Sequence, residues 1–100
     1  MQAELFADRA ALAALCRQHH IRRLSLFGSV LKGTAGPNSD VDLLVEFEPG
    51  HVPGMLRLGG IEAELSSLLG GRRVDLRTPQ DLSRHFRAEV VSAAELQYAA

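Results

Sequence analysis

Residues 40–47, Asp-Val-Asp-Leu-Leu-Val-Glu-Phe, constrain the fold of this chain more than any other segment. Apolar side chains at Val41, Leu43, Val45 and Phe47 recur with the period of two of a β-strand, so they share one face. A strand with one apolar face must bury that face against another layer of structure. The segment therefore predicts a strand in a sheet that helices cover.

The rest of the chain alternates between helical and extended patterns. The expected strands are residues 21–27, 40–47 and 72–77. The expected helices are residues 3–20, a short piece at 30–32, residues 58–69, and a C-terminal stretch that begins at Thr78-Pro79 and includes Phe86, Val90, Val91 and Leu96. This order predicts an α/β (α+β) fold with a small mixed β-sheet covered by helices, and Cys16 belongs to its core.

Length and charge limit the possible functions. The chain has 100 residues and a formal net charge of −1, which suits one domain over residues 1–100. The balanced charge, four Phe, one Tyr and no Trp disfavour a long nucleic acid as a partner. A single cysteine, no signal peptide pattern and no long apolar run lead us to expect a cytoplasmic protein.

Asp40 and Asp42 form the first candidate site. Because they lie two residues apart on one strand, both carboxylates project from the same face, with Cα atoms about 6.5 Å apart. Two desolvated carboxylates repel each other, and a divalent cation between them turns that repulsion into binding. Oxygen ligands of this kind suit Mg²⁺ or Mn²⁺. The pair alone is a weak signal, because chance gives it in about one of four chains of this composition.

The dipeptide Gly28-Ser29 strengthens that signal. It follows the expected strand 21–27 and precedes Asp40 by a turn and a loop. Gly28 permits a sharp turn that brings backbone N–H groups close to an anion, and the Ser29 hydroxyl adds a donor. Asp75, on the third expected strand, would supply the third carboxylate of a two-metal site. The spacing predicts a phosphate cradle beside metal-binding carboxylates.

The motifs Gly28-Ser-Val-Leu-Lys-Gly33 and Ser39-Asp-Val-Asp-Leu-Leu-Val45 resemble the signature of the minimal nucleotidyltransferases of the DNA polymerase β superfamily. The resemblance covers essentially the whole chain and implies the polymerase β-like nucleotidyltransferase fold. It also implies a transferase that moves a nucleoside monophosphate from a triphosphate, usually ATP, to an acceptor and releases pyrophosphate. Two Mg²⁺ ions would be its cofactors.

The resemblance assigns roles to the candidate residues. Asp40 and Asp42 would bind the metals, and Asp75 would complete the metal site and help to deprotonate the acceptor hydroxyl. Gly28 and Ser29 would hold the triphosphate.

Lys32 is the one departure within the motif. The family commonly has Ala-Arg before the second glycine, where this chain has Leu31-Lys32. Lys32 keeps the positive charge for a phosphate contact but lacks the bidentate fork of arginine.

The acceptor is implied by resemblance alone. Polymerases and drug-modifying relatives carry extra domains for their acceptors, and 100 residues leave no room for one. The chain resembles MntA-type antitoxins of HEPN/MNT toxin–antitoxin pairs, which implies a HEPN-domain ribonuclease toxin as a protein acceptor of AMP. Two alternatives stay open: a non-catalytic antitoxin that acts by binding, and a small-molecule nucleotidyltransferase that completes its acceptor pocket as a homo-oligomer.

The four histidines are His19, His20, His51 and His85. They share no i, i+4 spacing and no carboxylate-flanked pair. The sequence therefore predicts surface or helix-end positions for them, without a metal role.

Overall fold

A four-stranded mixed sheet organises the computed structural model, which describes residues 5–34, 36 and 39–100. The strand order is β3-β2-β1-β4, with β1 antiparallel to β2 and β4, and β2 parallel to β3. The strands are β1 (Ile21–Phe27), β2 (Val41–Phe47), β3 (Val74–Arg77) and β4 (Glu95–Ala99). The helices are α1 (Arg9–Gln18), α2 (Ser29–Lys32), α3 (Met55–Leu68), α4 (Arg87–Ala93) and a 3₁₀ turn, η1 (Pro79–Asp81). The small mixed sheet with helices confirms the predicted fold class.

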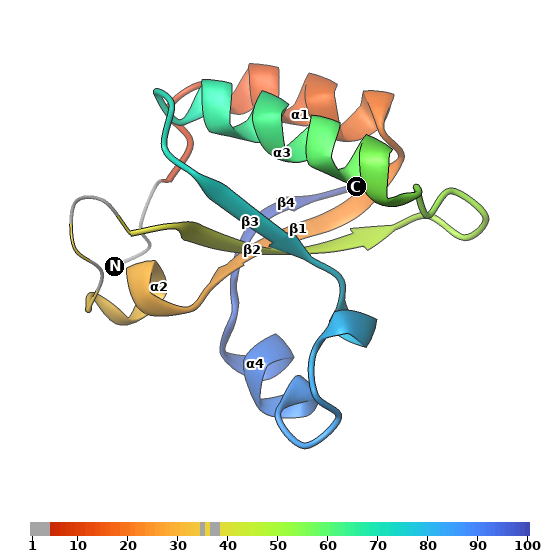
Figure 1. The fold of residues 1–100 in the computed structure, drawn as a ribbon. Helices are drawn as coiled ribbons and strands as arrows, with labels where there is room; N and C mark the ends of the chain where they lie inside the picture. The colour runs from red at the N-terminus through yellow and green to blue at the C-terminus, as the bar shows by residue number, and fades with distance from the viewer. Residues whose placement is uncertain (1–4, 35, 37–38) are drawn as a thin grey trace.

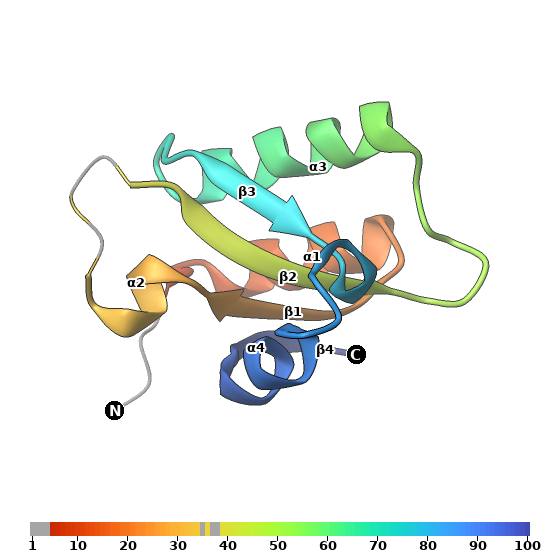
Figure 2. The same cartoon turned by 60° about the horizontal axis from the view of Figure 1, so that its bottom comes forward.

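The two longest helices, α1 and α3, lie side by side on one face of the sheet, as Figure 1 shows. The apolar face of β2 packs beneath them, since Val41, Leu43 and Val45 are fully buried in one core cluster with Ile61 and Leu65 of α3. Figure 2 shows α4 coming forward on the opposite side of the sheet. Across the described residues, no helix is long and apolar enough to cross a membrane.

Helix α1 begins at Arg9, later than the predicted start at residue 3. The Asp8 carboxylate accepts a hydrogen bond from the Ala11 N–H at 2.9 Å and so caps the first turn. Residues 5–8 precede the helix, and Phe6 among them is buried in the core. Residues 3 and 4 lie outside the described part of the chain. An acidic cap therefore sets the boundary that the alanine-rich pattern alone does not.

Cys16 lies on the buried face of α1 and belongs to the core, as predicted. Burial raises the pKa of its thiol to about 12, so almost no thiolate forms near neutral pH. We expect the native chain to show no measurable reaction with Ellman's reagent, whereas the chain unfolded in guanidinium releases one equivalent of product. Rapid reaction of the native thiol would contradict the described packing of α1.

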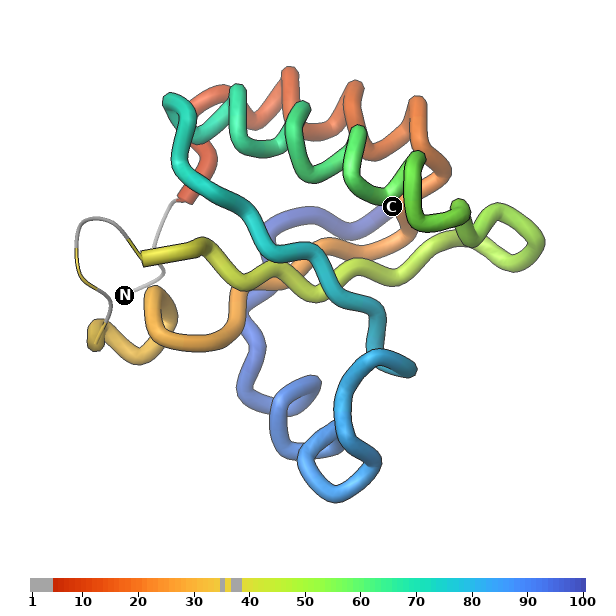
Figure 3. Tube along the Cα trace, viewed as in Figure 1, coloured from red at the N-terminus to blue at the C-terminus, as the bar shows by residue number. Residues whose placement is uncertain are grey.

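The prediction of one C-terminal helical stretch is only partly correct: Val90 and Val91 lie on a helix, but Phe86 precedes that helix and Leu96 follows it. Thr78 begins only the short turn η1, and a separate helix follows at Arg87–Ala93. Leu96, which we expected on a helix, belongs to β4, whose pairing with β1 covers an edge of the sheet. The traced backbone in Figure 3 shows this last segment returning alongside β1. Pairing with β1 decides the structure of residues 95–99, because the local pattern is too short to specify it.

Candidate active site

Gly28 makes the turn between β1 and α2. Its backbone has φ 79° and ψ −154°, a conformation that is essentially restricted to glycine. Phe27, the residue before it, lies opposite Asp42 of β2 in the antiparallel register. A side chain at position 28 would place its Cβ 2.9 Å from Cγ of Asp42. The Asp42 carboxylate therefore occupies the space that any other residue at position 28 would need.

Two of the three predicted aspartates, Asp42 and Asp75, lie on neighbouring strands. Asp42 and Asp75 are direct partners in the parallel pairing of β2 with β3, so their side chains share one face on strands about 4.8 Å apart. This face points away from α1 and α3, because the alternate residues of β2 form the core beneath those helices. Asp40 lies just before β2 and is exposed. The Val41 N–H donates to the Arg73 carbonyl at 2.8 Å and holds the start of β2 against the entry to β3.

The pKa of the Asp42 carboxyl is raised. Desolvation raises the pKa of this carboxyl above its ordinary value of 3.8, and the nearby charges of Asp75 and Asp40 raise it further. The Arg77 guanidinium partly offsets these effects on the pKa. Clustered carboxylates of this kind are what a bound divalent cation stabilises.

Arg77 is a site residue that the sequence reasoning missed. Its Nη2 and Nε atoms donate to Oδ2 of Asp75 at 3.2 Å and 3.3 Å. Considering only described residues, the carboxylates of Asp40, Asp42 and Asp75 do not all lie within 4.8 Å of one another. Arg77 therefore pairs with a carboxylate that the sequence predicted as a metal ligand. The i, i+2 spacing on one strand is the signal that could have identified Arg77.

The predicted phosphate-binding residues lie on one short segment next to Asp42. Gly28 is the N-cap of α2 and has no side chain to cap the helix, so the first-turn N–H groups lack a partner within the helix. Ser29 opens α2, and Lys32 is exposed in its last turn. Gly33 then ends the helix in a left-handed conformation. The turn thus places Gly28 beside Asp42, with Lys32 at the end of the same short helix.

A cavity of about 390 Å³ separates α2 from α4. Its size lies within the range of small-molecule binding sites. It is lined by Phe27, Gly28, Leu31, Lys32, Phe86, Glu89, Val90 and Ala93. The sequence identified the α2 side of this cavity. It did not place α4 opposite α2, because that arrangement depends on how the chain turns after β3 through η1.

Comparison with known proteins places this arrangement in a family. The model of the nucleotidyltransferase domain matches residues 9–96. The protein adenylyltransferase MntA of Thermococcus cleftensis is 45% identical over 56 residues, which are 56% of this chain and 54% of the relative. The chain thus spans about half the length of that relative. A candidate protein adenylyltransferase of Methanocaldococcus jannaschii is 31% identical over 77 residues, 77% of this chain and 80% of the relative.

Solved structures share the fold. A candidate minimal nucleotidyltransferase is 39% identical, with a TM-score of 0.70 and coverage of 88% of this chain and 87% of the other. A toxin–antitoxin crystal structure with AMP-PNP has a TM-score of 0.71 and 23% identity. The match covers 93% of this chain and 74% of the other. A structure of a tri-AMPylated Shewanella oneidensis HEPN toxin in complex with MNT antitoxin has a TM-score of 0.63 and 19% identity. The match covers 92% of this chain and 70% of the other. The resemblance seen in the sequence is confirmed, and the chain belongs to the nucleotidyltransferase domain family.

Proposed function

We propose that this chain transfers AMP from ATP to a hydroxyl group of a HEPN-domain toxin, releases pyrophosphate, and thereby acts as the antitoxin. The observation that carries the proposal is the packing of the Asp42 carboxylate against Gly28, with Asp75 beside it in register. The name of the Thermococcus cleftensis relative supports AMP as the transferred group. The AMPylated toxin held by the Shewanella oneidensis antitoxin supports the kind of partner.

Asp40, Asp42 and Asp75 would hold two Mg²⁺ ions. The residues fit this metal, because carboxylate oxygens are its usual protein ligands. Burial, together with the charges of Asp75 and Asp40, raises the pKa of Asp42. This is the second observation in favour, since a cation would relieve the repulsion between these carboxylates. When bound, the ions would neutralise charge on the phosphates and lower the pKa of the attacking hydroxyl.

The protein's own contribution is to position the reactants. Backbone N–H groups after Gly28, together with Ser29 and Lys32, would hold the triphosphate beside the aspartates. The acceptor oxygen then attacks the α-phosphorus, the bond from that phosphorus to the bridging oxygen breaks, and pyrophosphate leaves in line. Asp75, released from Arg77, would help to accept the proton of the acceptor hydroxyl.

Lys32→Ala tests the phosphate contact. We expect the KM for ATP to rise about tenfold with little change in kcat, because an exposed ammonium group that only binds the triphosphate contributes to ground and transition states alike. Steady-state pyrophosphate release against ATP concentration measures both constants.

Arg57→Ala is the matched control for Lys32→Ala. Arg57 is an exposed basic residue on α3, which covers the other face of the sheet. This variant should keep the wild-type KM. An unchanged KM in Lys32→Ala would remove Lys32 from the phosphate site.

An antitoxin that modifies the toxin can be distinguished from one that only covers it by measuring toxin binding and toxin neutralisation in the same variant. We expect Asp42→Asn to co-purify with the HEPN-domain toxin proposed as the acceptor but to leave the toxin's ribonuclease active. The reason is that the carboxylate serves the transfer and not the contact between the proteins. A variant that binds and neutralises like the wild type would instead identify an antitoxin that works by covering the toxin.

A further inference from the structure

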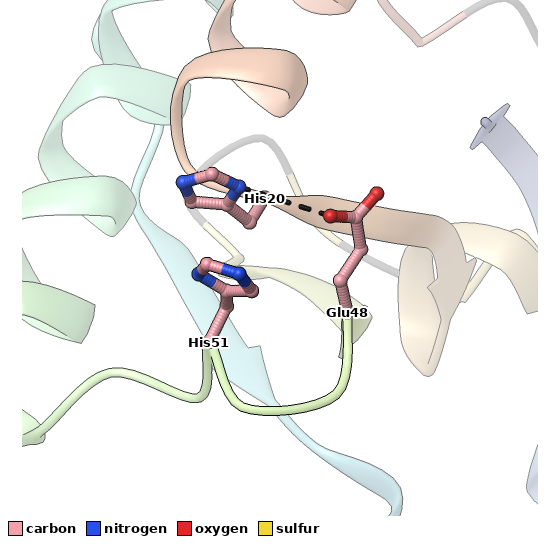
Figure 4. A group of neighbouring side chains, drawn as sticks. All are labelled: His20, Glu48 and His51. Carbon is pink, nitrogen blue, oxygen red and sulfur yellow. Dashed lines mark ion pairs between the residues drawn. The ribbon is translucent and has the colours of Figure 1, made fainter.

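His20, Glu48 and His51 form a second cluster of metal-ligating side chains, shown in Figure 4. The cluster lies at the end of β1 and β2 where Ile21 pairs with Phe47. Asp42 pairs with Phe27 at the other end, so strand geometry separates the two clusters by roughly 20 Å. The proposed transfer of AMP assigns no role to this end of the sheet.

Backbone hydrogen bonds connect the three residues of this cluster. The Glu48 N–H donates to the His20 carbonyl at 2.9 Å, and the His51 N–H donates to the Glu48 carbonyl at 3.0 Å. His20 has a left-handed backbone, with φ 57°, where the chain turns from α1 into β1. The three Cα positions are therefore fixed by the pairing of β1 with β2 and by the turn that follows β2.

The side chains of the three residues lie close to one another. The two imidazole rings stack with centroids 3.9 Å apart and planes inclined by 19°. Nδ1 of His20 lies 3.7 Å from Oε2 of Glu48. One ligand atom from each residue lies within 4.8 Å of the other two.

Two imidazole nitrogens and one carboxylate oxygen are a ligand set typical of Zn²⁺ with a fourth position for water. Mg²⁺ prefers oxygen ligands alone, so this cluster and the aspartates differ in metal class. Tetrahedral Zn²⁺ needs its ligand atoms about 3.3 Å apart, given bonds of about 2.0 Å. His20 and His51 are exposed, so their rings can turn out of the stack toward one ion without a change in the backbone.

We propose that His20, Glu48 and His51 form a binding site for a divalent transition-metal ion, for which Zn²⁺ is the probe. A bound ion would tie the turn between α1 and β1 to the loop that leads into α3. The sequence predicted no metal role for the histidines, because residues 20, 48 and 51 come together only through the pairing of β1 with β2.

Calorimetry with ZnCl₂ on the full chain, free of any polyhistidine tag, tests the site. We expect one Zn²⁺ per chain, a higher melting temperature with Zn²⁺, and a visible Co²⁺ absorption band typical of a tetrahedral site. His51→Ala and Glu48→Gln should each weaken Zn²⁺ binding at least about tenfold and lose the Co²⁺ band. His20→Asn should do the same with the fold kept, because Asn tolerates the left-handed backbone.

Two controls locate the ion. His85→Ala removes an exposed histidine outside the cluster and should bind Zn²⁺ like the wild type. Asp42→Asn should also keep Zn²⁺ binding, and His51→Ala should keep AMP transfer, so the metal site and the proposed function can fail separately. No Zn²⁺ binding by the wild type, or wild-type binding by His51→Ala and Glu48→Gln, would overturn the proposal.

Discussion

Asp42→Asn is expected to lower AMP transfer about a thousandfold or more without destabilising the metal-free protein. The carboxylate would bind the metals that the transfer requires, and the isosteric amide cannot replace its charge. In the metal-free protein the same charge is unfavourable, because burial, Asp75 and Asp40 all raise the pKa of Asp42. Transfer assays and thermal melts with EDTA measure the two effects.

The stability effect of Asp42→Asn should depend on pH in a defined direction. A folded-state pKa above the unfolded value means that the wild type loses stability as pH rises through the pKa of Asp42. The variant has no such group, so its advantage should be largest at neutral pH and shrink as pH falls through that pKa toward 3.8. A lower melting temperature for the metal-free variant at neutral pH would show that Asp42 is structural.

Glu46→Gln is the matched control for Asp42→Asn. Glu46 lies on the same strand and the same face as Asp42, and its partner is Arg23 at 3.9 Å. A long, partly exposed ion pair of this kind contributes little to stability. The control should keep both transfer activity and melting temperature, so a loss in Asp42→Asn alone would be specific to that position.

Gly28→Ala should abolish transfer and destabilise the fold. The new Cβ would lie 2.9 Å from Cγ of Asp42 and 3.0 Å from its Cβ, so the carboxylate must move. The backbone at φ 79° and ψ −154° costs a residue with a side chain about 1–3 kcal/mol in addition. We expect a drop in melting temperature of about 10 °C for a chain of this length.

Gly33→Ala is the control for Gly28→Ala. Both glycines have a positive φ, but only a side chain at position 28 would collide with Asp42. Gly33 has φ 75°, but no atom lies within 4 Å of a Cβ built there. Its replacement should cost about 1–2 kcal/mol and leave transfer active. Equal activity in Gly28→Ala and Gly33→Ala would show that the approach of Gly28 to Asp42 has no role in the reaction.

Local sequence patterns predict the centre of this fold well. The period of two in residues 40–47 identifies β2, and residues 21–27 give β1 with its observed bounds. Because Gly28 and Asp42 lie at the paired ends of these two strands, the same patterns also bring these two candidate residues together. The carboxylate pair and the glycine turn could therefore be identified before the structure.

Features that depend on contacts between distant segments could not be predicted in this way. β4 forms because the edge of β1 offers it backbone partners, and residues 95–99 do not specify a strand by themselves. His20 and His51 meet only because strand pairing closes the distance between them.

Transfer of label from α-labelled ATP to a HEPN-domain toxin, the proposed acceptor, is the most direct test of the proposed function. With Mg²⁺ and the wild-type chain, we expect label on the partner protein and release of unlabelled pyrophosphate. With EDTA, or with Asp42→Asn, no label should appear. A stable complex that never labels the partner would contradict AMP transfer and leave this chain as an antitoxin that acts by binding alone.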